Sequence, residues 1–204
     1  MVDPHGSSTT SLVFGGTVAA CARPWNDLTM DRCEECGFIY AEHGEESVGA
    51  EILSLGPRFT SVLMSAWTDS SDAVRLTRRP RADVWSAVEY GCHVRDVLLA
   101  QRERLFQALV EEKPAFVPIY RDHRAILAHY GDESPEQVAA ELGFAASLAA
   151  WAFERLDPSA WRRTCIYNFP EPSTRTLLWL AQHTLHEGEH HLLDIERNIG
   201  STGP

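Results

Sequence analysis

Apolar side chains recur every three or four positions from about residue 48, which is the spacing of one face of an amphipathic helix. Pro57 lies inside this pattern as a local flaw, because proline lacks the N–H group that continues a helical ladder. The side chains that define the pattern are Ile52, Leu53, Leu55, Phe59, Val62, Leu63 and Trp67.

Two later helices begin at capping boxes, in which a Ser and a Glu or Gln three residues on satisfy free backbone N–H groups. These sequences are Ser86–Glu89 and Ser134–Gln137. Together with a fourth helix that ends at Gly200, four helices and few strand-like alternations predict an all-α four-helix bundle. We assign residues 48–204 to this bundle and residues 1–47 to an irregular N-terminal extension. After the first helix, the predicted helices cover about residues 87–112, 135–156 and 173–198.

The connection Lys113–Glu133 is longer than a bundle of antiparallel neighbours needs. Long connections in compact domains are often functional, and this one is dense in side chains that bind or titrate. A solvated linker with one helical turn is an equal alternative. The candidate substrate-binding residues here are Tyr120, Arg121, His123 and Arg124.

Charge narrows the choice of partners. The 204 residues include 18 Lys and Arg against 29 Asp and Glu, a formal net charge of −11. An acidic surface repels phosphate backbones and anionic lipids, so neither nucleic acid nor a membrane is an expected partner. No apolar run approaches the roughly 20 residues that span a bilayer, and the first residues lack the pattern of a signal peptide. We therefore expect a soluble, cytoplasmic protein that acts on small molecules. The oligomeric state stays open, with a homodimer as one alternative.

Four of the nine His residues fall between His183 and His191 in the last predicted helix. Ligands four residues apart project from one helix face and can hold one metal ion. Two pairs have this spacing, Glu187 with His191 and His186 with His190. The apolar stripe of the helix favours an inward orientation for Glu187 and His191, and a more solvated position for His186 and His190. The other pair stays an alternative, because about 100° separates successive side chains.

A third ligand is expected from another helix, and His93 lies on an apolar face of the second predicted helix. Two His and one carboxylate leave a coordination position open, which is the arrangement of a catalytic metal site. Zn, Ni and Fe(II) all accept these donors, and Zn is the leading expectation.

Cys33 and Cys36 form a C-x-x-C pair followed by Gly37, which permits the tight turn that brings two thiolates onto one ion. Such a pair indicates a second, structural zinc site or a redox couple. A zinc site needs two further ligands. The candidates are Cys21 and His43, which are near in sequence, and Cys92 or a bundle His, which could come near in space.

The residues around His93, and His186-Glu187-x-x-His190-His191-x-x-Asp194, resemble those of the DinB-like metal-dependent bundles over about residues 48–199. The sequence is most similar to the branch that contains mycothiol-dependent maleylpyruvate isomerase. This resemblance implies an up-down-down-up bundle, a divalent ion held by His93, Glu187 and His191, and Asp194 at the acidic position after the last ligand. Members with three His ligands keep His186 and His190 as alternatives. The resemblance also implies a thiol cofactor such as mycothiol or bacillithiol.

These observations predict a metal-dependent enzyme of the thiol transferase or isomerase type. It would activate a mycothiol-like thiol, or water, for attack on an electrophilic small molecule. The isomerase reaction itself is not expected, because only five residues follow Ile199 and the isomerase's second domain has no counterpart. Two non-enzymatic alternatives are a metal-stabilised binding or stress-response protein and a redox sensor built on Cys33 and Cys36.

Overall fold

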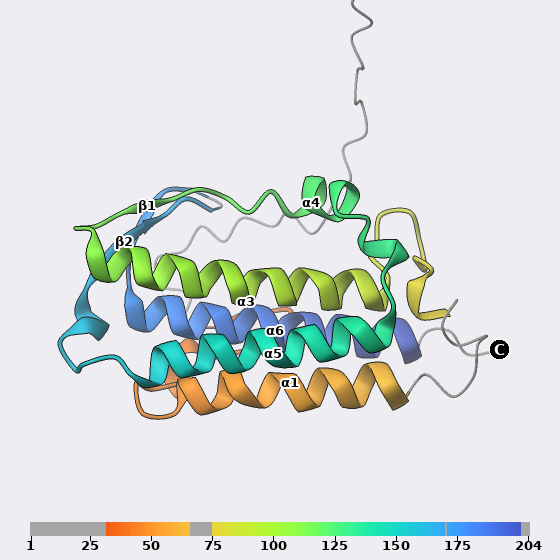
Figure 1. The fold of residues 1–204 in the computed structure, drawn as a ribbon, viewed down its shortest axis with the longest axis horizontal. Helices are drawn as coiled ribbons and strands as arrows, with labels where there is room; N and C mark the ends of the chain where they lie inside the picture. Colours follow the sequence, from red (N-terminus) through yellow and green to blue (C-terminus); the bar gives the residue numbers. More distant parts are fainter. Residues whose placement is uncertain (1–31, 66–74, 170, 201–204) are drawn as a thin grey trace, which may run out of the picture.

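The computed structural model describes residues 32–65, 75–169 and 171–200. Its main body is a bundle of four long helices that lie side by side (Figure 1). α1 and α6 run in one direction and α3 and α5 in the other, so the expected up-down-down-up bundle is confirmed. The four helices are α1 (Val48–Ser65), α3 (Ala87–Val110), α5 (Pro135–Glu154) and α6 (Leu177–Gly200).

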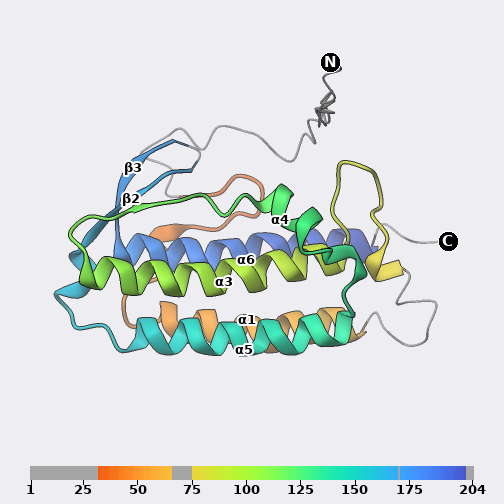
Figure 2. The ribbon, with the colours of Figure 1, turned by 45° about the horizontal axis from the view of Figure 1, so that its top comes forward.

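The direction of the helices explains the long connection between α3 and α5. These two neighbours are parallel, so the chain must return along the full length of α3 before α5 can begin (Figure 2). The return passes through β1 (Ala115–Phe116) and α4 (Arg121–Leu127). The connection that looked too long is therefore a crossover that the topology requires.

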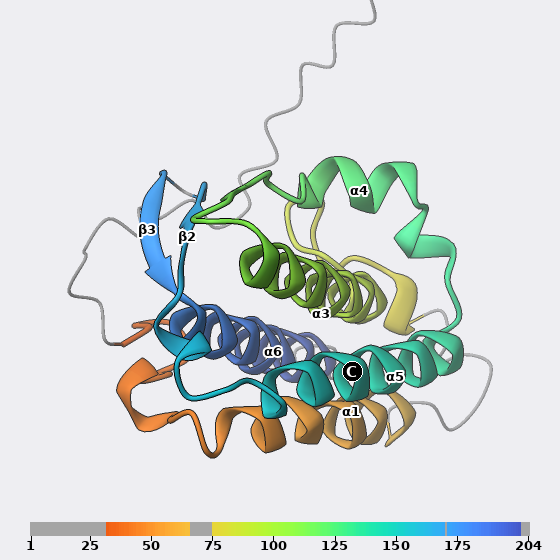
Figure 3. The same cartoon turned by 60° about the vertical axis from the view of Figure 1, so that its left-hand side comes forward.

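A small sheet accompanies the bundle, and sequence periodicity did not predict it. Its strand order is β1-β2-β3, with β1 parallel to β2 (Thr164–Tyr167) and β2 antiparallel to β3 (Ser173–Thr176). The last helix consequently starts at Leu177, and its predicted start at Ser173 was wrong. Strands of four residues or fewer are too short to show a periodic pattern, although their Thr and Ile side chains favour extended backbone. Figure 3 shows the sheet and α4 on the α3 side of the bundle, away from α1.

The helix starts agree with the capping signals. Ser86 Oγ accepts from the Glu89 N–H at 3.2 Å, and Glu89 Oε2 accepts from the Ser86 N–H at 2.8 Å. At the start of α5 only half of the predicted box forms, because the Gln137 side chain donates to Glu141 instead. Both helices nevertheless begin where predicted, which places their buried faces toward the core.

Gly188 sets how closely α6 approaches α1. A Cβ atom at this position would lie 2.4 Å from Leu55 Cδ1, which is far inside van der Waals contact. Leu55 is fully buried and packs against the α6 backbone there. The glycine therefore holds the middle of α6, beside Glu187, against the core.

A charged network ties α3 to the crossover. Asp96 accepts hydrogen bonds from the Tyr130 hydroxyl at 2.6 Å and from Arg124 and Arg95. Burial alone would raise the pKa of Asp96, but these donors outweigh it and lower the pKa. Arg95 also contacts Glu133 and Glu141, the latter on α5. The network fixes the end of the crossover against both helices.

The segment before α1 packs against α6. Gln182 on α6 donates to the His43 carbonyl at 2.9 Å, and Arg197 donates to the Glu35 carbonyl at 3.2 Å. Phe38 is buried in the core, and Tyr40 packs against it. Residues 32–47 thus cover one side of α6. Among the described helices, none is both long enough and apolar enough to cross a membrane.

Candidate metal centre

The structure brings the three predicted ligands His93, Glu187 and His191 together; we call them the His–Glu–His cluster. Each offers one ligand atom, and these atoms all lie within 4.8 Å of one another. Glu187 Oε2 lies 3.4 Å from His93 Nε2 and 3.7 Å from His191 Nε2. α3 and α6 pack against each other as antiparallel neighbours, so one residue of α3 meets two successive turns of α6.

Aromatic side chains fix the rings of this cluster. Trp85, just before the α3 cap, packs edge-on against His93 with ring centroids 5.2 Å apart. Tyr90 stacks on His191 at the same centroid distance. His93 is 1% exposed and His191 7%. The imidazoles are therefore held by packing, as a preformed site requires.

The carboxylate of Glu187 stays ionised although its side chain is only 23% exposed. Burial alone would raise its pKa, but hydrogen bonds from His191 and His93 and the charge of His183 lower it well below the usual value. Burial lowers the pKa of His93, which stays neutral. His191 is the opposite case: burial would lower its pKa, but Asp194 and Glu187 raise it to about 9.

Asp194 supports this cluster from behind. Its Oδ2 lies 3.0 Å from His191 Nδ1, which orients the ring with Nε2 toward Glu187 and His93. A carboxylate behind a histidine is the usual arrangement around a protein-bound metal ion. Two imidazoles, one carboxylate and this supporting carboxylate fit a divalent ion such as Zn, Ni or Fe(II).

His183 was not predicted as a site residue, yet it completes the surroundings of Glu187. Its Nε2 lies 3.5 Å from Glu187 Oε1, and its Nδ1 lies 3.0 Å from the Tyr40 hydroxyl. Trp179 stacks on the ring at a centroid distance of 4.6 Å. The four-residue spacing that paired Glu187 with His191 also pairs His183 with Glu187, and this was the signal that the sequence offered.

A family model described as the DinB superfamily matches residues 59–195. The chain belongs to the DinB superfamily. The solved structure of YfiT from Bacillus subtilis matches this DinB-superfamily chain with a TM-score of 0.66 and 18% sequence identity. The match covers 78% of this chain and 87% of YfiT, which is described as a probable metal-dependent hydrolase with an unusual four-helix bundle topology. This likeness shows a shared fold. No curated protein matches the chain.

His186 and His190 are not solvated, and that prediction was wrong. His186 is 1% exposed and the His190 side chain 11%, because residues 32–47 cover this face of α6. His186 Nδ1 lies 3.1 Å from the Tyr40 hydroxyl, and His190 Nδ1 lies 3.7 Å from Cys33 Sγ. The two alternative pairs on α6 of this DinB-superfamily protein therefore face different partners.

Cys33, Cys36, His186 and His190 form a second group, which we call the Cys–His cluster. Their ligand atoms also lie within 4.8 Å of one another. Burial raises the pKa of Cys36 to about 12, so its thiol holds its proton unless a cation is present.

The other candidates for completing a cysteine site lie elsewhere or outside the described residues. His43 pairs with Glu51. Cys92 is buried beside the Tyr130 carbonyl. Cys21 falls outside the described residues. Among the completing ligands that lie within the described residues, the structure therefore brings bundle His residues, and neither His43 nor Cys92, to Cys33 and Cys36.

The four candidate substrate-binding residues lie in three different surroundings. Arg124 pairs with Asp96 at 3.1 Å and holds the crossover in place. Tyr120 is 61% exposed, and its ring lies edge-on to that of His123, also exposed. Arg121 lies over the Phe169 ring, and its charge helps lower the pKa of the already buried His93. Arg121 is the member of this set whose charge reaches the His–Glu–His cluster.

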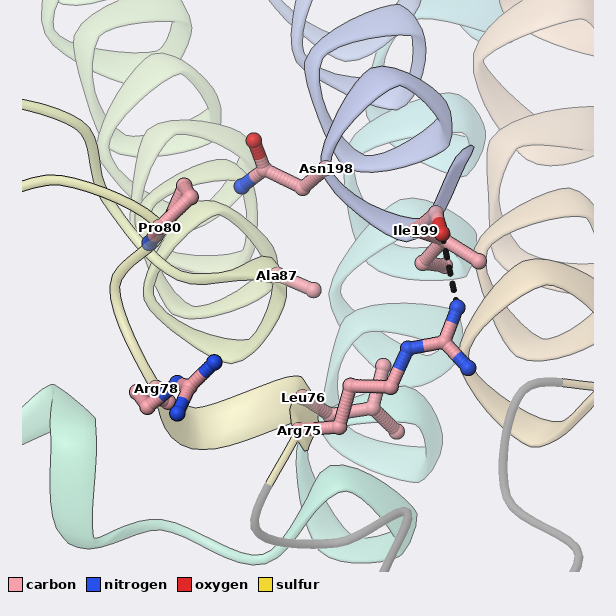
Figure 4. Close-up of a pocket in the computed structure, with 7 residues that line it drawn as sticks. All are labelled: Arg75, Leu76, Arg78, Pro80, Ala87, Asn198 and Ile199. Carbon is pink, nitrogen blue, oxygen red and sulfur yellow. Dashed lines mark hydrogen bonds between the residues drawn. The ribbon is translucent and has the colours of Figure 1, made fainter. Parts of the chain in front are cut away.

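A small cavity lies at the C-terminal end of α6 (Figure 4). Its volume is about 10 Å³, room for about one water molecule. Arg75 donates to the Ile199 carbonyl across its rim at 2.7 Å and so caps the helix end. No residue of either cluster lines this cavity, which has no room for a substrate. The lining residues are Arg75, Leu76, Arg78, Pro80, Ala87, Asn198 and Ile199.

Proposed function

We propose that this protein is a divalent-metal-dependent enzyme that uses a low-molecular-weight thiol, or water, to attack an electrophilic small molecule. The observation that carries the proposal is the buried His–Glu–His cluster with Asp194 behind it. Three protein ligands leave a coordination position for a reactant, unlike a closed structural site. The description of YfiT as a probable metal-dependent hydrolase supports water as nucleophile, and the resemblance to the mycothiol-dependent branch supports a thiol.

A divalent ion bound here would lower the pKa of a coordinated thiol or water and polarise a carbonyl group of the substrate. Glu187 supplies the negative charge that retains the ion, and neutral His93 supplies a nitrogen donor. Asp194 keeps the donor nitrogen of His191 in place. The packing of Trp85 against His93 and of Tyr90 against His191 would hold the two imidazoles in position.

We assign Arg121 the role of binding a negatively charged group of the substrate or of the thiol. Within the described residues it forms no ion pair with an acidic side chain, whereas Arg124 is paired with Asp96. A guanidinium group binds carboxylates with two parallel hydrogen bonds. An anionic substrate, or a thiol cofactor with carboxylates, fits this position.

We expect the reaction to take place among small molecules in the cytoplasm. The four cysteines of the described residues form no disulfide with one another, and free thiols are typical of proteins in a reducing compartment. The net charge of −11 opposes binding to nucleic acid or anionic lipid.

The test is turnover by protein loaded with Zn, Ni or Fe(II). Conjugation of mycothiol to an activated aryl halide and hydrolysis of an activated ester are followed in parallel. We expect His191→Ala to lower the rate by about 10²–10³-fold, the scale of losing a charge-stabilising group at a reacting centre. His129→Asn is the matched control, because His129 is exposed and Asn tolerates its left-handed backbone (φ 54°). Metal bound without turnover of either kind would support the non-enzymatic alternative.

A further inference from the structure

We propose that the Cys–His cluster binds a structural zinc ion that fixes the N-terminal segment onto α6, directly beside the His–Glu–His cluster. The proposal goes beyond the enzymatic site, because it concerns a different ligand set on a different face of the helix.

The ligand atoms lie close enough together to hold one zinc ion, and one sulfur–nitrogen distance matches that of a tetrahedral site. Zinc binds Cys sulfur at about 2.3 Å and His nitrogen at about 2.0–2.1 Å, so sulfur and nitrogen ligands lie about 3.6 Å apart. The separation of Cys33 Sγ from His190 Nδ1 is 3.7 Å. All four ligand atoms lie within 4.8 Å of one another, although they come from two segments far apart in the chain.

The backbone around the cysteines has the turn that such a site needs. The Gly37 N–H donates to the Cys33 carbonyl at 2.8 Å, and the Cys33 N–H donates to the Phe38 carbonyl at 2.7 Å. Gly37 has φ of +77°, a conformation that other residues rarely adopt. This turn brings both thiols to the same side, as the sequence predicted.

The two imidazoles have the outer partners expected of metal ligands. His186 Nδ1 lies 3.1 Å from the Tyr40 hydroxyl. His190 turns Nδ1 toward Cys33 and Nε2 toward the carboxylates of Glu35 and Asp194, at 3.4 and 3.7 Å. An oxygen acceptor on the outer nitrogen is the usual support for a ligating histidine.

The composition of the cluster points to a structural role. Two thiolates and two neutral imidazoles balance the charge of Zn²⁺, and four protein ligands leave no coordination position for a reactant. Cys33 is 1% exposed, and Phe38 packs 5.2 Å from the His186 ring. A closed, buried site of this kind stabilises a fold and does not take part in turnover.

Zinc at this cluster also sets the hydrogen bonds of its neighbour. If His186 binds through Nε2, its Nδ1–H donates to the Tyr40 oxygen, and the Tyr40 hydroxyl donates to His183 Nδ1. The proton of His183 then lies on Nε2, which faces Glu187 Oε1 at 3.5 Å. Structural zinc thus orients a hydrogen-bond donor toward the carboxylate of the other cluster.

The first experiment is elemental analysis of purified, zinc-loaded protein. We expect two zinc ions per chain in the wild type, one in Cys36→Ser and one in His191→Ala. Cys165→Ser is the control and should keep two zinc ions, because Cys165 is a free, buried cysteine that lies in β2, beside the Arg175 carbonyl, away from the cluster. A Cys36→Ser protein that folds and keeps as much zinc as the wild type would overturn the proposal.

X-ray absorption of zinc-loaded His191→Ala shows whether the Cys–His cluster binds zinc, even if Cys36→Ser does not fold. The expected shell is two sulfurs at about 2.3 Å and two nitrogens at about 2.0–2.1 Å. A shell of nitrogen and oxygen alone would refute the Cys–His site. Failure of the proposed function would give a different result. If the His–Glu–His cluster does not bind zinc, His191→Ala will contain as much zinc as the wild type, and the sulfur ligands will still be seen.

Discussion

The two clusters on α6 use the same helical spacing for different chemistry. Glu187 and His191 face His93 on α3, whereas His186 and His190, one position earlier in each case, face the cysteines of the N-terminal segment. Rotation by about 100° per residue is enough to give each pair its own neighbour. One helix can therefore carry two ligand pairs, and the elements packed on either side determine what each pair binds.

The clusters also differ in the type and number of ligands that they offer a metal ion. The His–Glu–His cluster offers a carboxylate and two imidazoles, and these three ligands leave a coordination position for a reactant. The Cys–His cluster offers thiols and a complete set of four. Asp194 lies between them, within 3.0 Å of His191 and 3.7 Å of His190, so the two share one support.

The largest difference between the clusters should appear in thermal unfolding. Loss of the Cys–His site frees a link between residues 157 positions apart. Closing a loop of that size contributes up to about 4–5 kcal/mol in the entropic description of a crosslink. We expect Cys36→Ser to lower Tm by about 10 °C and His191→Ala by less than about 3 °C.

Metal removal provides the control for that comparison. A strong chelator should lower the Tm of the wild type to that of Cys36→Ser and leave the variant nearly unchanged, as followed by circular dichroism. Equal decreases in Tm in the two variants would mean that the two clusters contribute equally to the stability of the fold.

Asp194→Asn tests the shared support. Removing the carboxylate behind a ligating histidine typically weakens metal binding by about 10- to 100-fold. We expect that loss at the His–Glu–His cluster, where the contact is shorter, and a smaller one at the Cys–His cluster. Competition with a chelating dye measures both. Asp132→Asn is the control, because Asp132 is exposed and contacts only the exposed His129 among described ion pairs. Equal losses of zinc affinity at the two clusters would contradict the prediction that the shorter contact, to His191, gives Asp194 the larger effect.

Two glycine substitutions test whether α6 must lie close to α1. Gly188→Ala gains about 1 kcal/mol of helix propensity but forces a methyl group against buried Leu55, at a cost of about 1–3 kcal/mol. We expect a net loss of about 1 kcal/mol, or about 2–4 °C in Tm. Gly143→Ala meets nothing within 4 Å and should stabilise the protein. Two shifts of the same sign in urea or thermal unfolding would contradict the close contact.

Tyr40→Phe should have the smallest effect. It removes the hydroxyl between His186 and His183 and keeps the ring. We expect unchanged zinc content and turnover lower by about fivefold, the scale of one hydrogen bond. Turnover equal to that of the wild type would show that the hydroxyl does not connect the clusters.

The sequence predicted those features that depend on residues close together in the chain, such as helix starts and the spacing of ligands along one helix. Ser86 and Ser134 marked two helix starts, and helical spacing singled out Glu187 and His191 before any partner was known. His93 was predicted from its apolar face. The structure brings these three together, and their role as ligands stays a prediction.

What the sequence did not reveal depends on contacts between distant segments. His186 is buried because Phe38 and Tyr40 pack against its ring, and His190 lies against Cys33 and Glu35. No periodicity in α6 records that these segments cover it. β3 was not predicted for a different reason: its four residues are too few to show a periodic pattern. His183 was overlooked although its spacing from Glu187 was visible.

The distance along the chain between the cysteines and their histidines has a consequence for biosynthesis. Cys33 leaves the ribosome 157 residues before His190. At roughly 5–20 residues per second, the thiols wait about 8–30 s for the helix that would complete their site. During that interval they are open to oxidation or to capture by the wrong metal. Correct loading therefore depends on the thiol redox state and the metal supply that the nascent chain meets.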